Sequence, residues 1–184
     1  MSLRVISGTA KGRELRPVSG DTTRPVTDRV KEALFDILAG DVQGSSWWDL
    51  FAGTGAVGIE ALSRGAAFAR FVDLKWAAVK TIHGNLDHTR LGEHSEVLYG
   101  DALAMLAAPA GRQFDYVYIA PPQYQGLWSR ALLALEANPE WLSEDAWVIV
   151  QIHPKEYQSL PLQILEEFDQ RKYGSTRLVF YVKT

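Results

Sequence analysis

Residues 47–58 read Trp-Trp-Asp-Leu-Phe-Ala-Gly-Thr-Gly-Ala-Val-Gly. The apolar run that ends at Phe51 predicts a strand, Gly53 and Gly55 predict a tight turn, and the pattern after them predicts a helix containing Gly58. Because glycine lacks a Cβ atom, such a turn lets the backbone approach a ligand closely. The helix behind it offers free N–H groups and a partial positive charge. This stretch therefore predicts a docking place for a cofactor.

The composition is that of an ordinary globular domain. The chain has 184 residues, 47% hydrophobic and 22% charged, which is enough for one α/β domain with a substantial core. It has no cysteine and only four scattered histidines, so disulfide and thiolate chemistry are excluded and a zinc site is disfavoured. No segment resembles a signal peptide or reaches the length of a membrane span. We expect a cytoplasmic monomer without a bound metal.

Charge is distributed unevenly along the chain. Residues 1–31 contain seven cations and three anions, a net charge of +4, whereas the other 153 residues carry −7. A basic arm on an acidic body is suited to binding a polyanion with one end. The alternative is a charged N-terminus that is only solvated. The cations of the arm are Arg4, Lys11, Arg13, Arg16, Arg24, Arg29 and Lys31.

The N-terminal part of the chain predicts a small hairpin followed by a helix. Residues 3–6 and 13–16 have short strand-like patterns separated by a turn-rich stretch. An irregular connection follows. A helix is then expected from Thr27, a suitable N-cap, to about Leu38, and Gly40 is expected to end it.

Strands and helices alternate along the rest of the chain, which predicts a parallel sheet with right-handed crossovers. The last two strands, 163–173 and 176–182, are joined only by Gly174 and Ser175, which predicts an antiparallel hairpin closing the sheet. The expected fold is α/β, with the Rossmann-like seven-stranded sheet of many methyltransferases in a domain over 25–184, after a basic hairpin and connection over 1–24. The other predicted strands are 47–51, 68–73, 96–99, 116–119 and 147–152, and the predicted helices are 56–63, 76–88, 102–107 and 127–137.

Carboxylates follow the predicted strands at the edge where doubly wound sheets bind ligands. Asp73 ends the second strand of the core, twenty residues after Gly53, and is placed to accept both ribose hydroxyls of an adenosine-containing cofactor. The alternative for Asp73 is an exposed loop residue. Asp101 and Ala102 follow the third strand, where the carboxylate is placed to receive an adenine amino group, to cap the next helix, or both.

Two consecutive prolines follow the fourth strand. Residues 119–124 read Ile-Ala-Pro-Pro-Gln-Tyr. Pro121 and Pro122 cannot continue a sheet ladder, and they hold the chain extended with its carbonyl groups free. A row of acceptors beside the Tyr124 ring suits a flipped nucleobase, which stacks on the ring and donates from its exocyclic amino group. The alternative is an ordinary loop at a strand exit.

Five segments together resemble one known family. Residues 4–8 and 11–13 are similar to its opening hairpin, and residues 23–35, Thr-Arg-Pro-Val-Thr-Asp-Arg-Val-Lys-Glu-Ala-Leu-Phe, resemble its most characteristic signature. Residues 49–55 are similar to its cofactor loop and residues 60–66 to the helix that follows. The family is RsmD, bacterial methyltransferases that act on guanine N2 of 16S ribosomal RNA, and the resemblance covers nearly the whole chain. The N-terminal signature is specific, whereas the glycine loop alone indicates only a methyltransferase.

The resemblance implies a cofactor, a partner and a set of site residues. The cofactor is S-adenosylmethionine, and the partner is 16S rRNA, free or in an assembling small ribosomal subunit. The catalytic loop implied is Ala120, Pro121, Pro122, Gln123 and Tyr124. The cofactor-binding residues implied are Thr27, Asp49, Phe51, Gly53, Thr54, Gly55, Asp73, Asp101 and Ala102. The RNA-binding residues implied are Arg4, Lys11, Arg13, Arg16, Arg24 and Arg29.

The chain departs from the family's pattern in two places. The family usually has Asp or Asn before Pro-Pro and an aromatic residue directly after, whereas here Ala120 comes first and Gln123 precedes Tyr124. A second acid usually follows the ribose-binding one, whereas this chain has Lys75. A charged acceptor is worth roughly 1.5–3 kcal/mol, and positioning the amine is worth on the order of 7–11 kcal/mol. We therefore expect slower rather than abolished transfer, with the carbonyls of Ala120 and Pro121 or the Gln123 amide as acceptors.

Three other functions are compatible with parts of the sequence. An amino-methyltransferase of other specificity, acting on DNA or RNA, shares the Pro-Pro-aromatic motif. A methyltransferase-like RNA-binding protein that has lost catalysis would explain Ala120. A nicotinamide-dependent dehydrogenase is supported by the glycine loop alone, and the acidic Asp49 before that loop fits an aminoacyl cofactor better.

Overall fold

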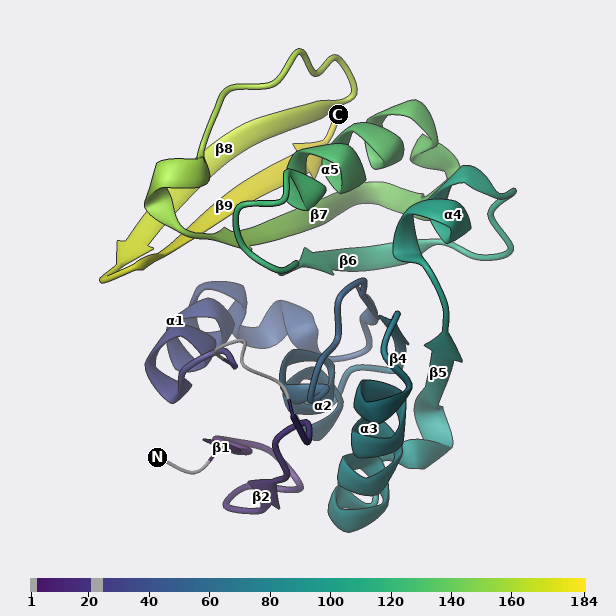
Figure 1. The fold of residues 1–184 in the computed structure, drawn as a ribbon, viewed down its shortest axis with the longest axis vertical. Coiled ribbons are helices and arrows are strands. Elements are labelled where there is room, and N and C mark those ends of the chain that lie inside the picture. Colours follow the sequence, from purple (N-terminus) through teal and green to yellow (C-terminus); the bar gives the residue numbers. More distant parts are fainter. Residues whose placement is uncertain (1–2, 21–24) are drawn as a thin grey trace.

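The chain forms a seven-stranded sheet with helices on both faces, preceded by a two-stranded hairpin (Figure 1). The computed structural model describes residues 3–20 and 25–184. The strand order is β5-β4-β3-β6-β7-β9-β8, in which β3 to β7 are parallel and β9 is antiparallel to both neighbours. The predicted fold class is confirmed. The strands are β3 (Ser46–Asp49), β4 (Phe68–Asp73), β5 (Ser95–Tyr99), β6 (Phe114–Ile119), β7 (Leu142–Ile152), β8 (Leu165–Tyr173) and β9 (Thr176–Lys183).

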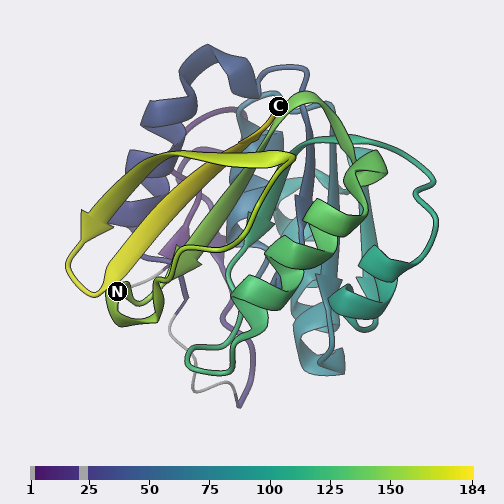
Figure 2. The same cartoon turned by 90° about the horizontal axis from the view of Figure 1, so that it is seen from above.

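The sheet separates the core into two layers, one on each face. Figure 2 shows α1 and α5 on opposite sides of the strands. One hydrophobic cluster joins the sheet to α1, α2 and α3, and the other joins it to α4 and α5. Central strands covered on both faces read as continuous apolar runs, as at Val148, Ile149 and Val150, which are fully buried. The helices are α1 (Asp28–Leu38), α2 (Ala56–Ser63), α3 (Trp76–Thr89), α4 (Ala102–Ala107) and α5 (Leu127–Ala137), and the 3-10 turns are η1 (Ala39–Val42), η2 (Gly92–His94), η3 (Pro139–Trp141) and η4 (Pro154–Glu156).

Several strand boundaries differ from the predictions by one or two residues, as at β3, which ends at Asp49 rather than Phe51. Two further differences concern β7 and the end of α1. Strand β7 begins at Leu142 rather than at residue 147, because the polar residues 143–145 belong to a stretch where the pairing with β6 is irregular. Helix α1 ends at Leu38 as expected, but Gly40 does not end it. Ala39 leaves the helical conformation with φ 48°, and Gly40 lies within η1.

The N-terminal hairpin packs on the sheet domain. Its strands β1 (Leu3–Arg4) and β2 (Glu14–Leu15) are shorter than predicted, with two residues each. The turn between them touches α2 so closely that a Cβ on Gly8 would lie 1.9 Å from the Ser63 carbonyl oxygen. Glycine is therefore required at that position. Apolar hairpin residues also enter the first core cluster, namely Val5, Ala10 and Leu15.

The Glu60 side chain on α2 holds this hairpin in place. Its carboxylate accepts the backbone N–H groups of Ile6 (2.9 Å) and Ser7 (3.1 Å). It also pairs with Lys31 Nζ of α1 at 3.3 Å and with Arg64 Nε at 2.8 Å. The side chains of Lys31 and Glu60 are fully buried, and burial lowers the pKa of Lys31 while the charge of Glu60 opposes that shift. A buried pair of this kind depends on having both partners present.

We expect Lys31→Met to lower the free energy of unfolding by about 3 kcal/mol. The reason is that Glu60 loses its buried counter-charge, and the counter-charge of Arg64 remains. Urea unfolding followed by tryptophan fluorescence measures the loss. The control is Arg171→Met, which removes an exposed ion pair with Asp169 and should cost less than about 1 kcal/mol. Equal losses in the two variants would show that the buried pair does not stabilise the fold.

Candidate active site

The carboxyl ends of four parallel strands meet at one edge of the sheet. β3 comes first in the chain, β4 and β5 lie on one side of it, and β6 lies on the other. The strand order thus reverses between β3 and β6, which is where open α/β sheets bind ligands. Asp49 ends β3, Asp73 ends β4 and the Pro-Pro loop follows β6. The structure therefore brings together the main strand-end residues that the sequence predicted.

The glycine turn after β3 has the predicted geometry. Gly53 and Gly55 have φ angles of 56° and 81°, in the left-handed region that favours glycine. Helix α2 starts directly after Gly55 and lies against β4. A Cβ on Gly58 would be 2.4 Å from the Phe71 ring. The first two glycines therefore shape the turn, and the third permits close packing of helix on strand.

Asp49 is a buried carboxylate with an unused acceptor atom. Its exposure is 3%, and its Oδ1 has no hydrogen-bond partner within the described part of the chain. Burial and then the charge of Asp73 raise the pKa of Asp49 to about 7, while backbone N–H groups of Phe51 and Gly58 oppose the shift. A buried acceptor without a partner is costly unless a ligand supplies a donor. This site therefore fits a cationic donor such as the α-ammonium group of S-adenosylmethionine.

Asp73 faces the glycine turn. Its Oδ2 accepts the N–H of Gly53 at 2.9 Å, and its Oδ1 accepts the N–H of Lys75 at 2.9 Å. A carboxylate oxygen can accept more than one hydrogen bond, so both oxygens can still accept ribose hydroxyls. Gly53 and Asp73 lie twenty positions apart in the chain but are in direct contact in the fold.

The other residues predicted to bind the cofactor have structural roles in the fold. The hydroxyl of Thr27 accepts a backbone N–H at the start of α1 (3.2 Å), and the carboxylate of Asp101 does the same for α4 (2.9 Å). Capping is one of the two roles expected of Asp101. The Thr54 hydroxyl accepts a backbone N–H in α2 (3.3 Å), and Phe51 and Ala102 pack in the second core cluster. Cofactor contacts from these residues stay predictions.

The Pro-Pro loop is held by two residues that the sequence analysis missed. Tyr124 has φ 61°, unusual for a residue with a side chain, and its N–H donates to Glu156 Oε1 at 2.7 Å. The second oxygen of Glu156 accepts the N–H of His153 at 3.1 Å, and the rings of Tyr124 and His153 lie 5.7 Å apart. The spacing of His153 and Glu156 around Pro154 is typical of a capping box and was the available signal. Within the loop, the half-buried residues are Ala120, Pro121 and Pro122, and the exposed ones are Gln123 and Tyr124.

Several predicted RNA-binding cations are exposed beside the hairpin. Arg4 pairs with Asp28 at 3.3 Å, and Arg13 donates to the carbonyl of His88 at 3.1 Å. The guanidinium of Arg29 lies 6.0 Å from the Tyr173 ring. The remaining exposed cations are Lys11 and Arg16.

Two cations of the basic arm stand apart from this group. Lys31 is buried against Glu60 and adds no charge to the surface. It shares a buried stripe at helical spacing with Leu34 and Leu38, and that spacing was the signal for its burial. Arg24 lies outside the described residues, so its predicted contact with RNA is not tested.

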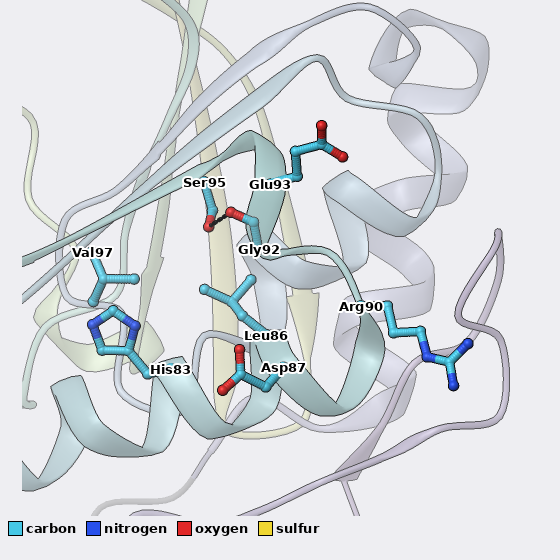
Figure 3. Close-up of a pocket in the computed structure, with 8 residues that line it drawn as sticks. All are labelled: His83, Leu86, Asp87, Arg90, Gly92, Glu93, Ser95 and Val97. Carbon is cyan, nitrogen blue, oxygen red and sulfur yellow. Dashed lines mark hydrogen bonds between the residues drawn. The ribbon is translucent and has the colours of Figure 1, made fainter.

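The groove in Figure 3 is not at the predicted site. It has a volume of about 480 Å³ and is formed by the C-terminal half of α3, by η2 and by β5. Its wall includes Ser95, the first residue of β5. The groove therefore lies toward the amino ends of the strands, whereas Asp73 is at a carboxyl end. A second groove of about 420 Å³ is lined by Asp41, Asp115 and Asp145, among others, near the amino ends of β3 and β6. Neither groove includes a residue that the sequence assigned to the cofactor.

Neither a metal-binding cluster nor a membrane-spanning helix is found in the described residues. Over 3–20 and 25–184, no group of three or more histidine, aspartate or glutamate side chains is arranged to hold a metal ion. No helix within the same ranges has the length and apolar character needed to cross a membrane.

The fold, the glycine turn and the strand-end carboxylates define the class as S-adenosylmethionine-dependent methyltransferases. The solved structure of the Escherichia coli protein yhhF is 30% identical and superimposes with a TM-score of 0.87, covering 100% of this chain and 98% of that one. A structure titled as an RNA methyltransferase from Salinibacter ruber in complex with S-adenosyl-L-homocysteine shares the fold at 15% identity, with a TM-score of 0.64 and coverage of 87% and 94%.

The particular family follows from the sequence comparisons. Residues 3–182 match the family model described as Conserved hypothetical protein 95, and the chain belongs to this family, the RsmD family. The Bacillus subtilis protein YlbH is 40% identical over 98% of this chain and 99% of its own length. Ribosomal RNA small subunit methyltransferase D of Haemophilus influenzae is 33% identical over 97% and 91%. The resemblance stated from the sequence motifs is confirmed.

The raised pKa of Asp49 predicts a specific pH dependence. Between pH 4 and 7 the unfolded state ionises Asp49 while the folded apoprotein keeps it protonated, so this residue lowers stability as pH rises through about 7. We expect Asp49→Asn to be more stable than the wild type at pH 8, by up to about 4 kcal/mol for a shift of about 3 units, and equally stable at pH 4. Urea unfolding at both pH values measures this. A constant difference between the two proteins would contradict the shift.

Proposed function

We propose that this protein transfers the methyl group of S-adenosylmethionine to an exocyclic amine of ribosomal RNA, specifically guanine N2 of 16S rRNA. The observation that carries the proposal is the buried carboxylate oxygen of Asp49, which has no partner among the described residues and lies at the strand-order reversal, with Asp73 and the Pro-Pro loop at the same edge. The relative from Haemophilus influenzae is named a ribosomal RNA small subunit methyltransferase, which supports the choice of substrate. We also propose that the protein acts as a monomer in the cytoplasm.

Two carboxylates of the chain bind the two ends of the cofactor. Asp49 binds the ammonium group and becomes ionised in doing so, because a cation beside a buried carboxyl lowers its pKa. Asp73 accepts the ribose hydroxyls while it keeps its bond to Gly53. The turn through Gly55 lets the backbone approach the bound molecule closely. When bound, the cofactor supplies an electrophilic methyl group on a positively charged sulfur.

Residues of the Pro-Pro loop orient the attacking amine. The carbonyls of Ala120 and Pro121, or the Gln123 amide oxygen, accept hydrogen bonds from N2, and the Tyr124 ring supports the base. Held by Asp49 and Asp73, S-adenosylmethionine would supply its methyl group to the N2 lone pair, its sulfur would keep the electrons of the C–S bond, and solvent would take the proton that N2 loses. Positioning of this kind is worth on the order of 7–11 kcal/mol, so it outweighs the single charged acceptor that Ala120 lacks.

The Ala120 position favours one second candidate function. A family member that binds RNA and cofactor without transferring methyl would account for the missing carboxamide or carboxylate. The retained geometry of Asp49 and Asp73 supports the enzyme. Transfer of labelled methyl groups to under-modified small ribosomal subunits, to free 16S rRNA and to DNA separates these functions, and mapping of the modified nucleotide tests the guanine assignment.

In that assay we expect Tyr124→Ala to lose roughly 1–3 kcal/mol of stacking on the base, which is about fivefold to 150-fold in rate. Tyr124→Phe keeps the ring and is the control, because it should retain activity near that of the wild type. Unchanged transfer in Tyr124→Ala would remove this ring from the site. Binding of RNA and cofactor with no transfer to any substrate would establish the binding-protein alternative.

The hairpin is proposed as the RNA-binding unit. Reversing the charge of Lys11, Arg13 and Arg16 to Glu should weaken RNA binding and reduce the slope of log K against log salt by about 2 to 3, because fewer counterions are released. Binding titrations with 16S rRNA between 50 and 200 mM salt give the slope, and cofactor affinity should not change. The matched control reverses three exposed cations elsewhere, namely Arg130, Arg171 and Lys172. The same slope in both triple variants would contradict the proposal.

A further inference from the structure

The hairpin and its continuation are attached to the cofactor-binding unit of the fold. The backbone N–H of Thr9 donates to the Ser63 carbonyl at 2.8 Å, and the N–H of Ala10 donates to the Ser63 hydroxyl at 2.9 Å. Glu60 accepts two more hairpin N–H groups one turn earlier on the same helix. This helix, α2, begins at the glycine turn. The hairpin is therefore bonded to the element whose first residues shape the cofactor loop.

Asn85 connects Arg16, the residue directly after β2, to the glycine turn. This residue of α3 is fully buried. Its Oδ1 accepts the N–H of Arg16 at 2.8 Å, and its Nδ2 donates to the carbonyl oxygens of Arg16 at 3.1 Å and of Thr54 at 2.9 Å. Both N–H groups of the amide and its oxygen are thus engaged. Thr54 is the residue between the two glycines of the turn.

The contacts of Asn85 make the position of the arm and the position of the loop interdependent. A buried amide that is fully hydrogen-bonded holds its partners in one arrangement, because any displacement leaves a buried polar group unpaired. Arg16 is an exposed cation proposed to bind RNA, and Gly53 next to Thr54 donates to Asp73. The Asn85 amide therefore links the backbone of Arg16 to the loop that carries the predicted cofactor contacts.

We propose that Asn85 is a positioning residue that couples RNA binding on the hairpin to cofactor binding at the glycine turn. This inference rests on the proposed function, since it needs both ligands. Each ligand orders the same Arg16–Asn85–Thr54 connection, so the second ligand binds to a part of the protein that is already ordered. The coupling is reciprocal, because the two affinities belong to one thermodynamic cycle.

Coupling is measured as the ratio of RNA affinities with and without S-adenosylhomocysteine. Filter binding of transcribed 16S rRNA to the full chain should show about fivefold or greater tightening by saturating S-adenosylhomocysteine in the wild type. In Asn85→Ser and in Asn85→Asp the ratio should fall close to 1, whatever the RNA affinity of each variant without the nucleoside. The matched control is Asn138→Ser, which removes an amide bonded to the carbonyl of Ala134 in α5 and should leave the ratio at its wild-type value.

Hydrogen exchange in the wild type tests the connection without any substitution. Adding RNA in the absence of cofactor should slow exchange in peptides that cover residues 50–58, and unchanged exchange there would overturn the proposal even if the Asn85 variants fail to fold. Binding of both ligands with independent affinities would also overturn it while leaving the proposed function intact. A wild-type protein that binds no RNA would overturn the proposed function and this inference together.

Discussion

The carboxylate of Glu60 is the interaction on which the rest of the arrangement depends. It is fully buried, and within the described residues its four hydrogen-bond and ion-pair partners come from the hairpin, from α1 and from Arg64 directly after its own helix. Lys31 also donates to the carbonyl of Arg4, so the pair closes a connection between α1 and the hairpin. A buried charge tolerates neither a missing counter-charge nor a missing donor. Glu60 therefore joins the basic arm to both α1 and α2, and the bonds of Ser63 and Asn85 to the arm add to this attachment.

Because Glu60 lies on α2, this helix joins the hairpin to the glycine turn. The amino end of α2 follows the glycine turn, and its carboxyl end carries Ser63 and Arg64, which contact the hairpin and Glu60. The helix is eight residues long, about 12 Å at the rise of an α-helix. In the proposed function, a polyanion on the arm and a nucleoside at the strand ends would act on the two ends of this one short helix. The Asn85 amide adds a direct connection beside it.

The sequence predicted the fold and the strand-end residues because both depend on local patterns. Gly53 and Asp73 could be assigned from strand ends twenty residues apart, and the sheet order then brought them into contact. The bonds that hold the arm could not be found in this way. Glu60 and Ile6 are 54 positions apart, and Asn85 and Arg16 are 69 apart. A single buried polar residue on a helix leaves no periodic signal, so only the folded arrangement identifies its partners.

The loop after β6 shows how a departure from the family pattern is accommodated. The backbone of Tyr124 adopts a left-handed conformation that costs roughly 1–2 kcal/mol, and the short hydrogen bond to Glu156 offsets it. The carboxylate of Glu156 also accepts the N–H of His153, directly after β7. Glu156 therefore ties the loop after β6, which lacks the usual acid, to the end of β7. The expected outcome is a site that relies on orientation of the base more than on charge. Substituting Ala120 by Asp would then add a carboxylate at a half-buried position in a loop already fixed by Glu156, and its partial desolvation opposes the gain of an acceptor.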